Sequence, residues 1–299
     1  MGWRTIFISN PSQLSCKHSR LLIRQGDEET DIPIEDIEVI VIETLQATIT
    51  SHLMSELACW GVAVFFCDTL HTPCGVSLAF HQHHRTLKIL RAQTAISVPL
   101  RKNLWRLVVT QKLLNQAACL DILKLSGGDD LRSLAKQVRS GDPDNRESVG
   151  ARLYFSILMP RSARSAATHL NIFLNYGYSI LRGAVARALT AYGLLPSLGI
   201  HHKNELNAFN LADDFIEPFR PLVDLWVMTN ARVESSLTPI HKHALVGLLS
   251  SQIKINGGKE TVLRAIEITA YSFVGSCENK DADRLALPQL LPIEFKNRE

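Results

Sequence analysis

The sequence predicts an α+β protein, with a small N-terminal β-rich domain at residues 1–78 and a larger all-α domain at residues 79–299. Three observations support this division. The first part contains short runs of β-branched and aromatic residues, which are typical of strands. From about Phe80 the apolar residues instead recur with the 3.6-residue period of amphipathic helices. Gly and Pro turn signals separate the segments in both parts.

Four strands and one helix are expected in the N-terminal domain. The predicted strands are residues 4–9, 20–25, 37–42 and 62–67. A helix is predicted between Ser51 and Trp60, because the preceding Ile-Thr-Ser sequence offers an N-cap. A domain this small has open strand edges and apolar strands that need to be covered. We therefore expect it to mediate homodimerisation.

Seven helical segments are expected in the C-terminal domain. They are residues 85–95, 100–123, 131–137, 146–158, 165–192, 219–230 and 259–274. Breaks such as Gly127-Gly128 and Gly257-Gly258 separate them.

Composition excludes several classes of protein. The net charge of +3 and the hydrophobic content of 46% are ordinary for a soluble domain, so nucleic-acid binding would depend on where the charges lie. No apolar run approaches the roughly 18 residues that span a bilayer, and the N-terminus lacks a secretory signal pattern. The six cysteines have irregular spacings, which favours reduced, mostly buried thiols over disulfides or structural zinc. We expect a cytoplasmic protein without membrane contact.

Glu147 is the first candidate ligand for a hard metal ion. It lies in DPDNRES (residues 142–148), just inside a helix start that Asp142 or Asp144 would set. A plain alternative is a capping box, with Glu147 three residues after an Asp144 N-cap.

His202 is the second candidate. It follows His201 in a predicted loop, so at most one of the two imidazoles is expected to face a given site. The alternative is an ordinary surface histidine.

The third candidate region is DDFIE (residues 213–217). On a helix, Asp214 and Glu217 share a face, and so do Asp213 and Glu217. Like charges at this spacing repel unless a cation lies between them, so removing the repulsion should slightly stabilise the metal-free protein. Carboxylates in an apolar segment are costly unless they are paired or metal-bound. The alternative is a solvated acidic turn.

Two carboxylates and one imidazole suit Mg²⁺ or Mn²⁺. The sequence contains no HExxH zinc motif, no P-loop, and no GxSxG or GxGxxG motif.

Three separated motifs resemble those of the CRISPR-associated integrase family, the first and most widespread Cas proteins, in its type II branch. They are GWRTIFISNPSQLSCKHSRLLI at residues 2–23, the DPDNRE element within residues 142–155, and the stretch at residues 171–224 that contains LGIHHKNELNAFNLADDFIEPFR. They occur in the order found in the family and cover most of the chain.

The resemblance implies that the helical domain is catalytic and that Glu147, His202 and Glu217 are both the catalytic residues and the metal ligands. Asp214 matches a secondary acidic position, and whether it is a ligand stays open. The implied function is a metal-dependent DNA integrase, also able to cleave DNA, that joins 3′-hydroxyl ends of short DNA segments to a repeat array by transesterification. A structure-selective DNA nuclease and a non-catalytic DNA-binding scaffold are the alternatives.

The resemblance also implies the partners. These are double-stranded DNA with 3′-hydroxyl ends, repeat DNA, a second copy of the chain, a small Cas partner dimer, and type II effector proteins. His83, His84 and Arg85 lie in a basic segment that favours contact with DNA phosphates, with zinc binding as a weaker alternative. Tyr176 would either approach the DNA end or pack between helices, and Arg220 would either pair with Glu217 or reach a phosphate.

Overall fold

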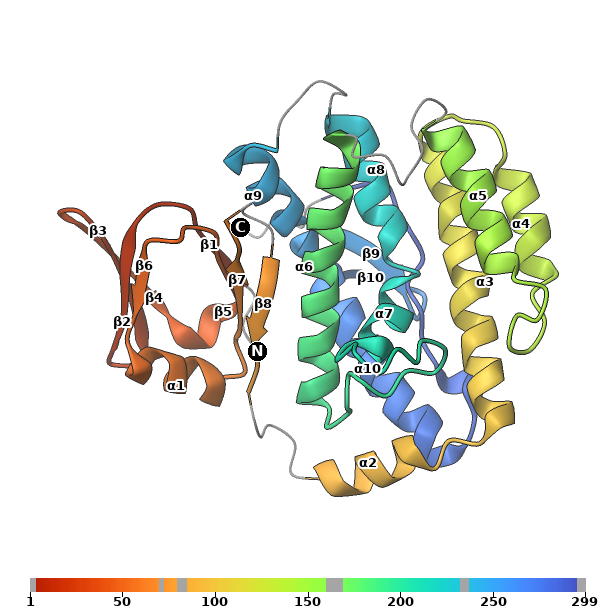
Figure 1. Cartoon of the computed structure of the whole chain (residues 1–299), viewed down its shortest axis with the longest axis horizontal. Helices are drawn as coiled ribbons and strands as arrows, with labels where there is room; N and C mark the ends of the chain where they lie inside the picture. Colours follow the sequence, from red (N-terminus) through yellow and green to blue (C-terminus); the bar gives the residue numbers. More distant parts are fainter. Residues whose placement is uncertain (1–3, 70–72, 80–84, 160–168, 232–236, 295–299) are drawn as a thin grey trace. The chain divides into compact units, whose positions relative to one another are not determined.

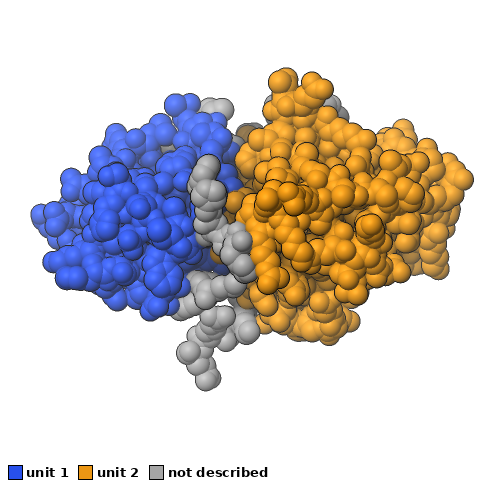
Figure 2. Space-filling view, turned by 90° about the horizontal axis from the view of Figure 1, so that it is seen from below, with its two compact units in different colours: residues 1–84 blue, residues 85–299 orange. Residues whose placement is uncertain are grey.

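The computed structural model describes residues 4–69, 73–79, 85–159, 169–231 and 237–294. The chain divides into two compact units, residues 1–84 and 85–299, a few residues beyond the expected boundary (Figure 2). A strand-rich unit precedes a mainly helical one, as the sequence predicts (Figure 1).

The N-terminal unit contains two four-stranded sheets. Their strand orders are β1-β5-β7-β8 and β4-β3-β2-β6. The strands are β1 (Arg4–Ile8), β2 (Ser12–Lys17), β3 (Arg20–Gln25), β4 (Glu28–Pro33), β5 (Ile37–Ile42), β6 (Ala47–Ile49), β7 (Ala63–Cys67) and β8 (Pro73–Ser77). β5 pairs in parallel with β1 and β7, and all six of its residues are buried. Its nearly continuous apolar run is typical of a strand covered on both faces.

The helix α1 (Ser51–Cys59) begins where the sequence predicts, because the Thr50 hydroxyl accepts a hydrogen bond from the Leu53 amide. Leu53 and Leu57 bury this helix in the core of the unit, together with Leu14 and Leu21. Four further strands, β2, β4, β6 and β8, were not predicted from the sequence. β4 reads EETDIP and has low strand propensity, but its full-length antiparallel pairing with β3 outweighs that preference.

Helices build most of the C-terminal unit. They are α2 (Thr86–Thr94), α3 (Val98–Ile122), α4 (Gly128–Lys136), α5 (Arg146–Leu158), α6 (His169–Ala191), α7 (Asn210–Ile216), α8 (Arg220–Asn230), α9 (Pro239–Gly247) and α10 (Val262–Asn279). α3 packs against α4, α5 and α8, whereas α6 packs against α7, α8, α9 and α10 (Figure 1).

The expectation that this unit is wholly α-helical was wrong at one place. β9 (Gln252–Ile255) and β10 (Gly258–Thr261) form an antiparallel hairpin, so α10 begins at Val262 rather than at residue 259. Asn256 and Gly257 form its turn with φ values of 50° and 81°. The signal was present, because alternating apolar residues before an Asn-Gly pair are typical of such a hairpin.

The predictions about membrane helices and cysteines can be compared with the residues that the structure describes. No helix there is long and apolar enough to cross a membrane. All six cysteines are free thiols, of which Cys67, Cys119 and Cys277 are buried and Cys59 and Cys74 are exposed.

Candidate functional site

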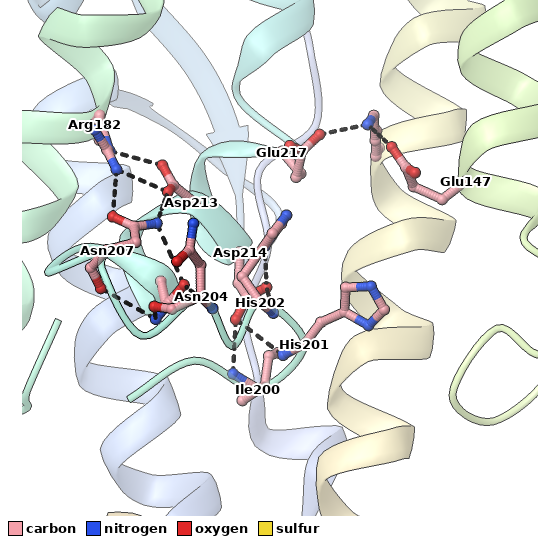
Figure 3. A network of polar contacts seen from close by, with 12 residues as sticks. Glu147, Arg182, Ile200, His201, His202, Asn204, Asn207, Asp213, Asp214 and Glu217 are labelled. Atoms are coloured by element: carbon pink, nitrogen blue, oxygen red, sulfur yellow. Dashed lines mark hydrogen bonds and ion pairs between the residues drawn. The ribbon is translucent and has the colours of Figure 1, made fainter. Parts of the chain in front are cut away.

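The site is organised around Lys112, on the buried side of α3. Its side chain is only 6% exposed, and its Nζ forms ion pairs with the carboxylates of both Glu147 and Glu217. Both glutamates pair with this one nitrogen, and Figure 3 shows the Glu147 and Glu217 side chains pointing toward one another. A buried ammonium is costly unless it is paired, so these contacts hold the three side chains together.

Glu147 reaches Lys112 because the Asp142 side chain holds the first turn of α5. The Asp142 carboxylate accepts hydrogen bonds from the Arg146 amide (2.8 Å) and the Glu147 amide (2.9 Å). Asp144 instead pairs with Arg139. The capping-box interpretation of Glu147 was therefore wrong, since Asp142 supplies the cap and the Glu147 side chain points to α3.

A close approach of α5 to α3 also depends on Gly150. A Cβ atom at this position would lie 2.1 Å from Cδ2 of Leu113, the residue after Lys112. A side chain at residue 150 would have to displace the buried Leu113 side chain, so glycine favours the close packing that keeps Glu147 within reach of the ammonium.

Glu217 follows the last residue of α7, and its side chain is 7% exposed. Arg220 adds a second cation, with its Nε 3.3 Å from Oε1 of Glu217. Burial alone would raise the pKa of Glu217, but the charges of Lys112 and Arg220 outweigh it and bring the pKa to about 2. Glu217 is therefore ionised at neutral pH.

Asp214 has a different role, although it lies only one helical turn before Glu217. Its fully buried carboxylate accepts hydrogen bonds from the amides of Ile200 (2.7 Å), His201 (3.1 Å) and His202 (3.1 Å). It also bonds to Nδ1 of His202 at 2.7 Å, which is the main cause of the raised pKa of His202. The alternative of a solvated acidic turn was wrong for Asp214, because its carboxylate is fully buried and is held by these four groups of residues 200–202 (Figure 3). The predicted repulsion between Asp214 and Glu217 stays a prediction.

Gly199 makes this loop geometry accessible. A Cβ atom there would lie 2.3 Å from the carbonyl oxygen of His202 and 2.9 Å from the Asp214 carboxylate. The loop can close around Asp214 only because residue 199 has no side chain.

The two adjacent histidines have separate environments, as the sequence predicts. The His201 ring stacks on Trp105 with a centroid distance of 4.0 Å and an interplanar angle of 4°. Burial lowers the pKa of His201. His202 turns to Asp214 instead, and the charge of Glu217 is among the causes that raise its pKa.

A second set of contacts fixes the later part of the loop at residues 197–209, which precedes α7. Arg182 donates to Asn207 Oδ1 (2.7 Å) and to Asp213 Oδ2 (2.9 Å), and Asn207 itself donates to Asp213 at 2.7 Å. Asn210 Nδ2 donates to the carbonyls of Ser197, Asn204 and Asn207. Asp213, like Asp214, is thus a loop anchor.

A cavity of about 430 Å³ lies beside this loop. Its wall includes the polar and basic residues Arg101, His202, Lys203, Asn204 and Asn210. The cavity gives His202 a solvent-facing side next to cationic groups.

Asn115, one turn after Lys112, connects the site to the C-terminal segment. Its amide nitrogen donates to the carbonyl oxygens of Pro218 (2.7 Å) and Pro288 (2.9 Å), and its oxygen accepts from the Leu290 amide (3.1 Å). Pro218 directly follows Glu217, so this buried amide helps to fix the backbone at that carboxylate.

The other candidate residues, which were proposed to contact DNA, lie in different environments. Tyr176 is fully buried, which favours the helix-packing alternative over contact with DNA. Arg220 pairs with Glu217 and lies over the Tyr178 ring at 4.9 Å. Arg85 is exposed at the N-cap of α2, whereas His83 and His84 lie outside the described residues.

Sequence reasoning missed Lys112 and Asn115. A signal for Lys112 was present, because it falls at a core position of its helix, four residues after the buried Val108 and next to the buried Leu113. A charged residue at such a position requires a charged partner.

The three predicted ligands do not form a ready-made metal cluster. Within the described ranges, no group of three or more His, Cys, Asp or Glu side chains is arranged to hold an ion. The donor chemistry nevertheless fits Mg²⁺ or Mn²⁺, because Glu147 and Glu217 already converge on one cationic centre. The contact of His202 Nδ1 with Asp214 leaves Nε2 for a ligand, and such a carboxylate contact is usual for metal-binding histidines.

The fold and this site define a class of protein with a strand-rich unit followed by a helical unit that carries convergent acidic and imidazole groups. The family model for CRISPR associated protein Cas1 matches residues 6–237. The chain therefore belongs to the Cas1 family of CRISPR-associated nucleases and integrases.

Relatives and solved structures agree with this assignment. A protein named CRISPR-associated endonuclease Cas1, from Neisseria meningitidis serogroup C (strain 8013), is 45% identical over 98% of both chains. A casposase bound to integration product has the same fold, with a TM-score of 0.77 and 19% identity over 93% of this chain and 92% of the other. A Cas6-RT-Cas1--Cas2 complex has a TM-score of 0.73 and 16% identity over 97% of this chain and 36% of that chain.

The anchoring role of Asp214 gives a testable prediction. Asp214→Asn should lower the free energy of unfolding by about 2–4 kcal/mol, because a neutral amide cannot accept all the hydrogen bonds of the buried carboxylate. Urea denaturation measures this loss, and amide hydrogen exchange at Ile200, His201 and His202 should become faster.

The matched control is Asp130→Asn on the exposed surface of α4, which should change the free energy by less than about 0.5 kcal/mol. A wild-type urea midpoint and unchanged exchange in Asp214→Asn would contradict the anchoring role.

Proposed function

We propose that this chain is a divalent-metal-dependent DNA integrase of CRISPR adaptation. It would join the 3′-hydroxyl ends of short DNA segments to a repeat array by transesterification, and it would also cleave DNA. The observation that carries the proposal is the convergence of Glu147 and Glu217, from distant parts of the sequence, on one buried cationic point beside His202.

Each residue has a defined part in this proposal. The carboxylates of Glu147 and Glu217 and the Nε2 atom of His202 would hold Mg²⁺ or Mn²⁺. When bound, such an ion activates a hydroxyl and offsets charge on a phosphate. Asp214 orients the His202 ring through Nδ1, and Arg220 holds Glu217 from the other side. The basic wall of the neighbouring cavity would receive a DNA strand through its phosphates.

The reaction itself requires no covalent intermediate with the enzyme. The incoming 3′-oxygen forms a new bond to phosphorus while the old phosphodiester bond breaks and releases a 3′-hydroxyl. Positioning and electrostatic stabilisation are sufficient for such a step, so a Ser, Tyr or Cys nucleophile is unnecessary.

A structure-selective nuclease is the competing function that uses the same residues. Supercoiled plasmid incubated with short DNA that carries free 3′ ends separates the two functions. Integration yields covalently joined products, whereas a nuclease yields only nicked or linear plasmid. The fold likeness to a casposase bound to integration product favours the integrase.

We further propose that the chain works as a homodimer together with a small Cas partner dimer, and with type II effector proteins in the cell. The structural neighbour that is a Cas6-RT-Cas1--Cas2 complex supports the Cas partner. We also propose double-stranded DNA with 3′-hydroxyl ends and repeat DNA as substrates, and the fold likeness to a casposase bound to integration product supports this.

Replacing the proposed ligands should remove activity. Glu147→Gln, His202→Ala and Glu217→Gln should each lower strand transfer with Mn²⁺ by at least about 100-fold, because charge stabilisation in the transition state is lost. DNA binding should change little. A half-site integration assay with labelled DNA measures the effect.

His201→Ala is the matched control and should retain most activity, since its ring stacks on Trp105. An inactive His201→Ala with an active His202→Ala would move the ligand to His201. Full activity in both glutamate variants would exclude the metal mechanism.

DNA affinity should fall steeply with salt, because phosphate contacts by cationic residues would dominate binding. Replacing His83, His84 and Arg85 together by Ala should reduce the slope of log affinity against log salt without changing sequence preference. Fluorescence anisotropy from about 50 to about 300 mM salt, a roughly sixfold range of ionic strength, measures the slope. An unchanged slope would assign these residues to packing.

The N-terminal unit should carry the dimer interface, because its open sheet edges need covering. Light scattering should give a dimer for the full chain and for residues 1–84, and a monomer for residues 85–299. The idea fails if residues 1–84 are strictly monomeric while residues 85–299 form the dimer.

A further inference from the structure

Lys112 occupies the point at which a divalent ion would meet its two carboxylate ligands. Its ammonium pairs with Glu147 and with Glu217 at the same time, and almost none of its side chain is exposed. No other cation in the described site contacts both glutamates, since Arg220 contacts only Glu217 among them.

The charges of this group are balanced. Glu147 and Glu217 supply two negative charges, and Lys112 and Arg220 supply two positive charges. Two carboxylates side by side, one buried and one partly buried, repel each other unless a cation lies between them, so the ammonium keeps the pair assembled. A divalent ion added between the same oxygens would face the ammonium at contact distance, which is strongly unfavourable.

We infer that Lys112 is an exchangeable counter-ion built into the chain. In the metal-free protein its ammonium holds Glu147 and Glu217 together, and it withdraws from the point between them when a divalent ion binds. This inference rests on the proposed function, because it takes the two glutamates as the metal ligands.

The chemistry of lysine suits such an exchange. Its ammonium is a compact charge on a flexible four-carbon stem, so it can leave by side-chain rotation without moving α3. Arginine at this position would bind the carboxylates through a rigid planar fork and would be harder to displace. Lys112 is therefore a positioning residue that also sets metal affinity.

The test uses the purified full-length chain, freed of metal by a chelator and then dialysed. Lys112→Met keeps an unbranched side chain, one atom shorter than lysine, and removes its charge. Without metal, this variant should melt roughly 5–10 °C below the wild type, because the buried carboxylate of Glu217 and the partly buried one of Glu147 lose their shared partner. Isothermal titration should show Mn²⁺ binding at least about tenfold tighter than in the wild type, since the competing cation is gone.

Lys242→Met is the matched control, because Lys242 is a similarly buried lysine on α9, which packs on α6. It can lower the melting temperature, but its affinity for Mn²⁺ should stay within about twofold of the wild type. Lys112→Arg should melt near the wild type without metal and bind Mn²⁺ more weakly. This second variant keeps the test informative if Lys112→Met does not fold.

Two results would overturn the inference. One is Mn²⁺ binding by Lys112→Met that is equal to or weaker than that of the wild type, which would make Lys112 a fixed part of the site. The other is unchanged or tighter binding by Lys112→Arg. Failure of the proposed function is distinguishable, since Glu147→Gln and Glu217→Gln would then keep wild-type Mn²⁺ affinity with Lys112 intact.

Discussion

The pairing of one buried ammonium with two carboxylates fixes the centre of the helical unit. Lys112 lies on α3, Glu147 on α5, and Glu217 directly after α7, so a single charge requirement ties together segments more than a hundred residues apart. Because a buried ion without partners is costly, the helices cannot separate without exposing or neutralising these groups. Gly150 and Asp142 then set how closely and from which point α5 approaches.

Asp214 and Glu217 illustrate how neighbouring acidic residues acquire unlike roles. Asp214 binds backbone amides and one imidazole, whereas Glu217 faces two cationic side chains. The contacts of Asp214 shape the loop at residues 199–202, and those of Glu217 gather charged groups at the centre of the site. The loop in turn directs His202 to the side of the site where Glu217 contributes to its electrostatics, while His201 is held against Trp105.

The order of the strand-rich and helical units could be predicted from the sequence, because strand-like runs and the 3.6-residue helical period are both local patterns. The helix at Ser51–Cys59 was predicted for the same reason, since Thr50 caps it within three residues. β4 was missed because its stability comes from pairing with β3, which a propensity does not report. Among the site residues, Glu147, His202 and Glu217 were predicted by type and motif. Lys112 was not, because one lysine in a long helix is ordinary until its position in the core is known. The hydrogen bonds of Asp214 were not predicted, because its partners include three backbone amides, which no residue type indicates.

Asn115 has a consequence for how the end of the chain relates to the site. The matched family region ends at residue 237, yet the Asn115 amide joins the backbone at Pro218 to the backbone at Pro288 and Leu290. Gln289 also bonds to Lys254 of the hairpin, so the segment is fastened on two sides. Residues 288–290 thus help to fix the backbone beside the site. Removing them would take two hydrogen-bond partners from a buried amide one helical turn from Lys112, and the effect would reach Glu217 through the adjacent Pro218.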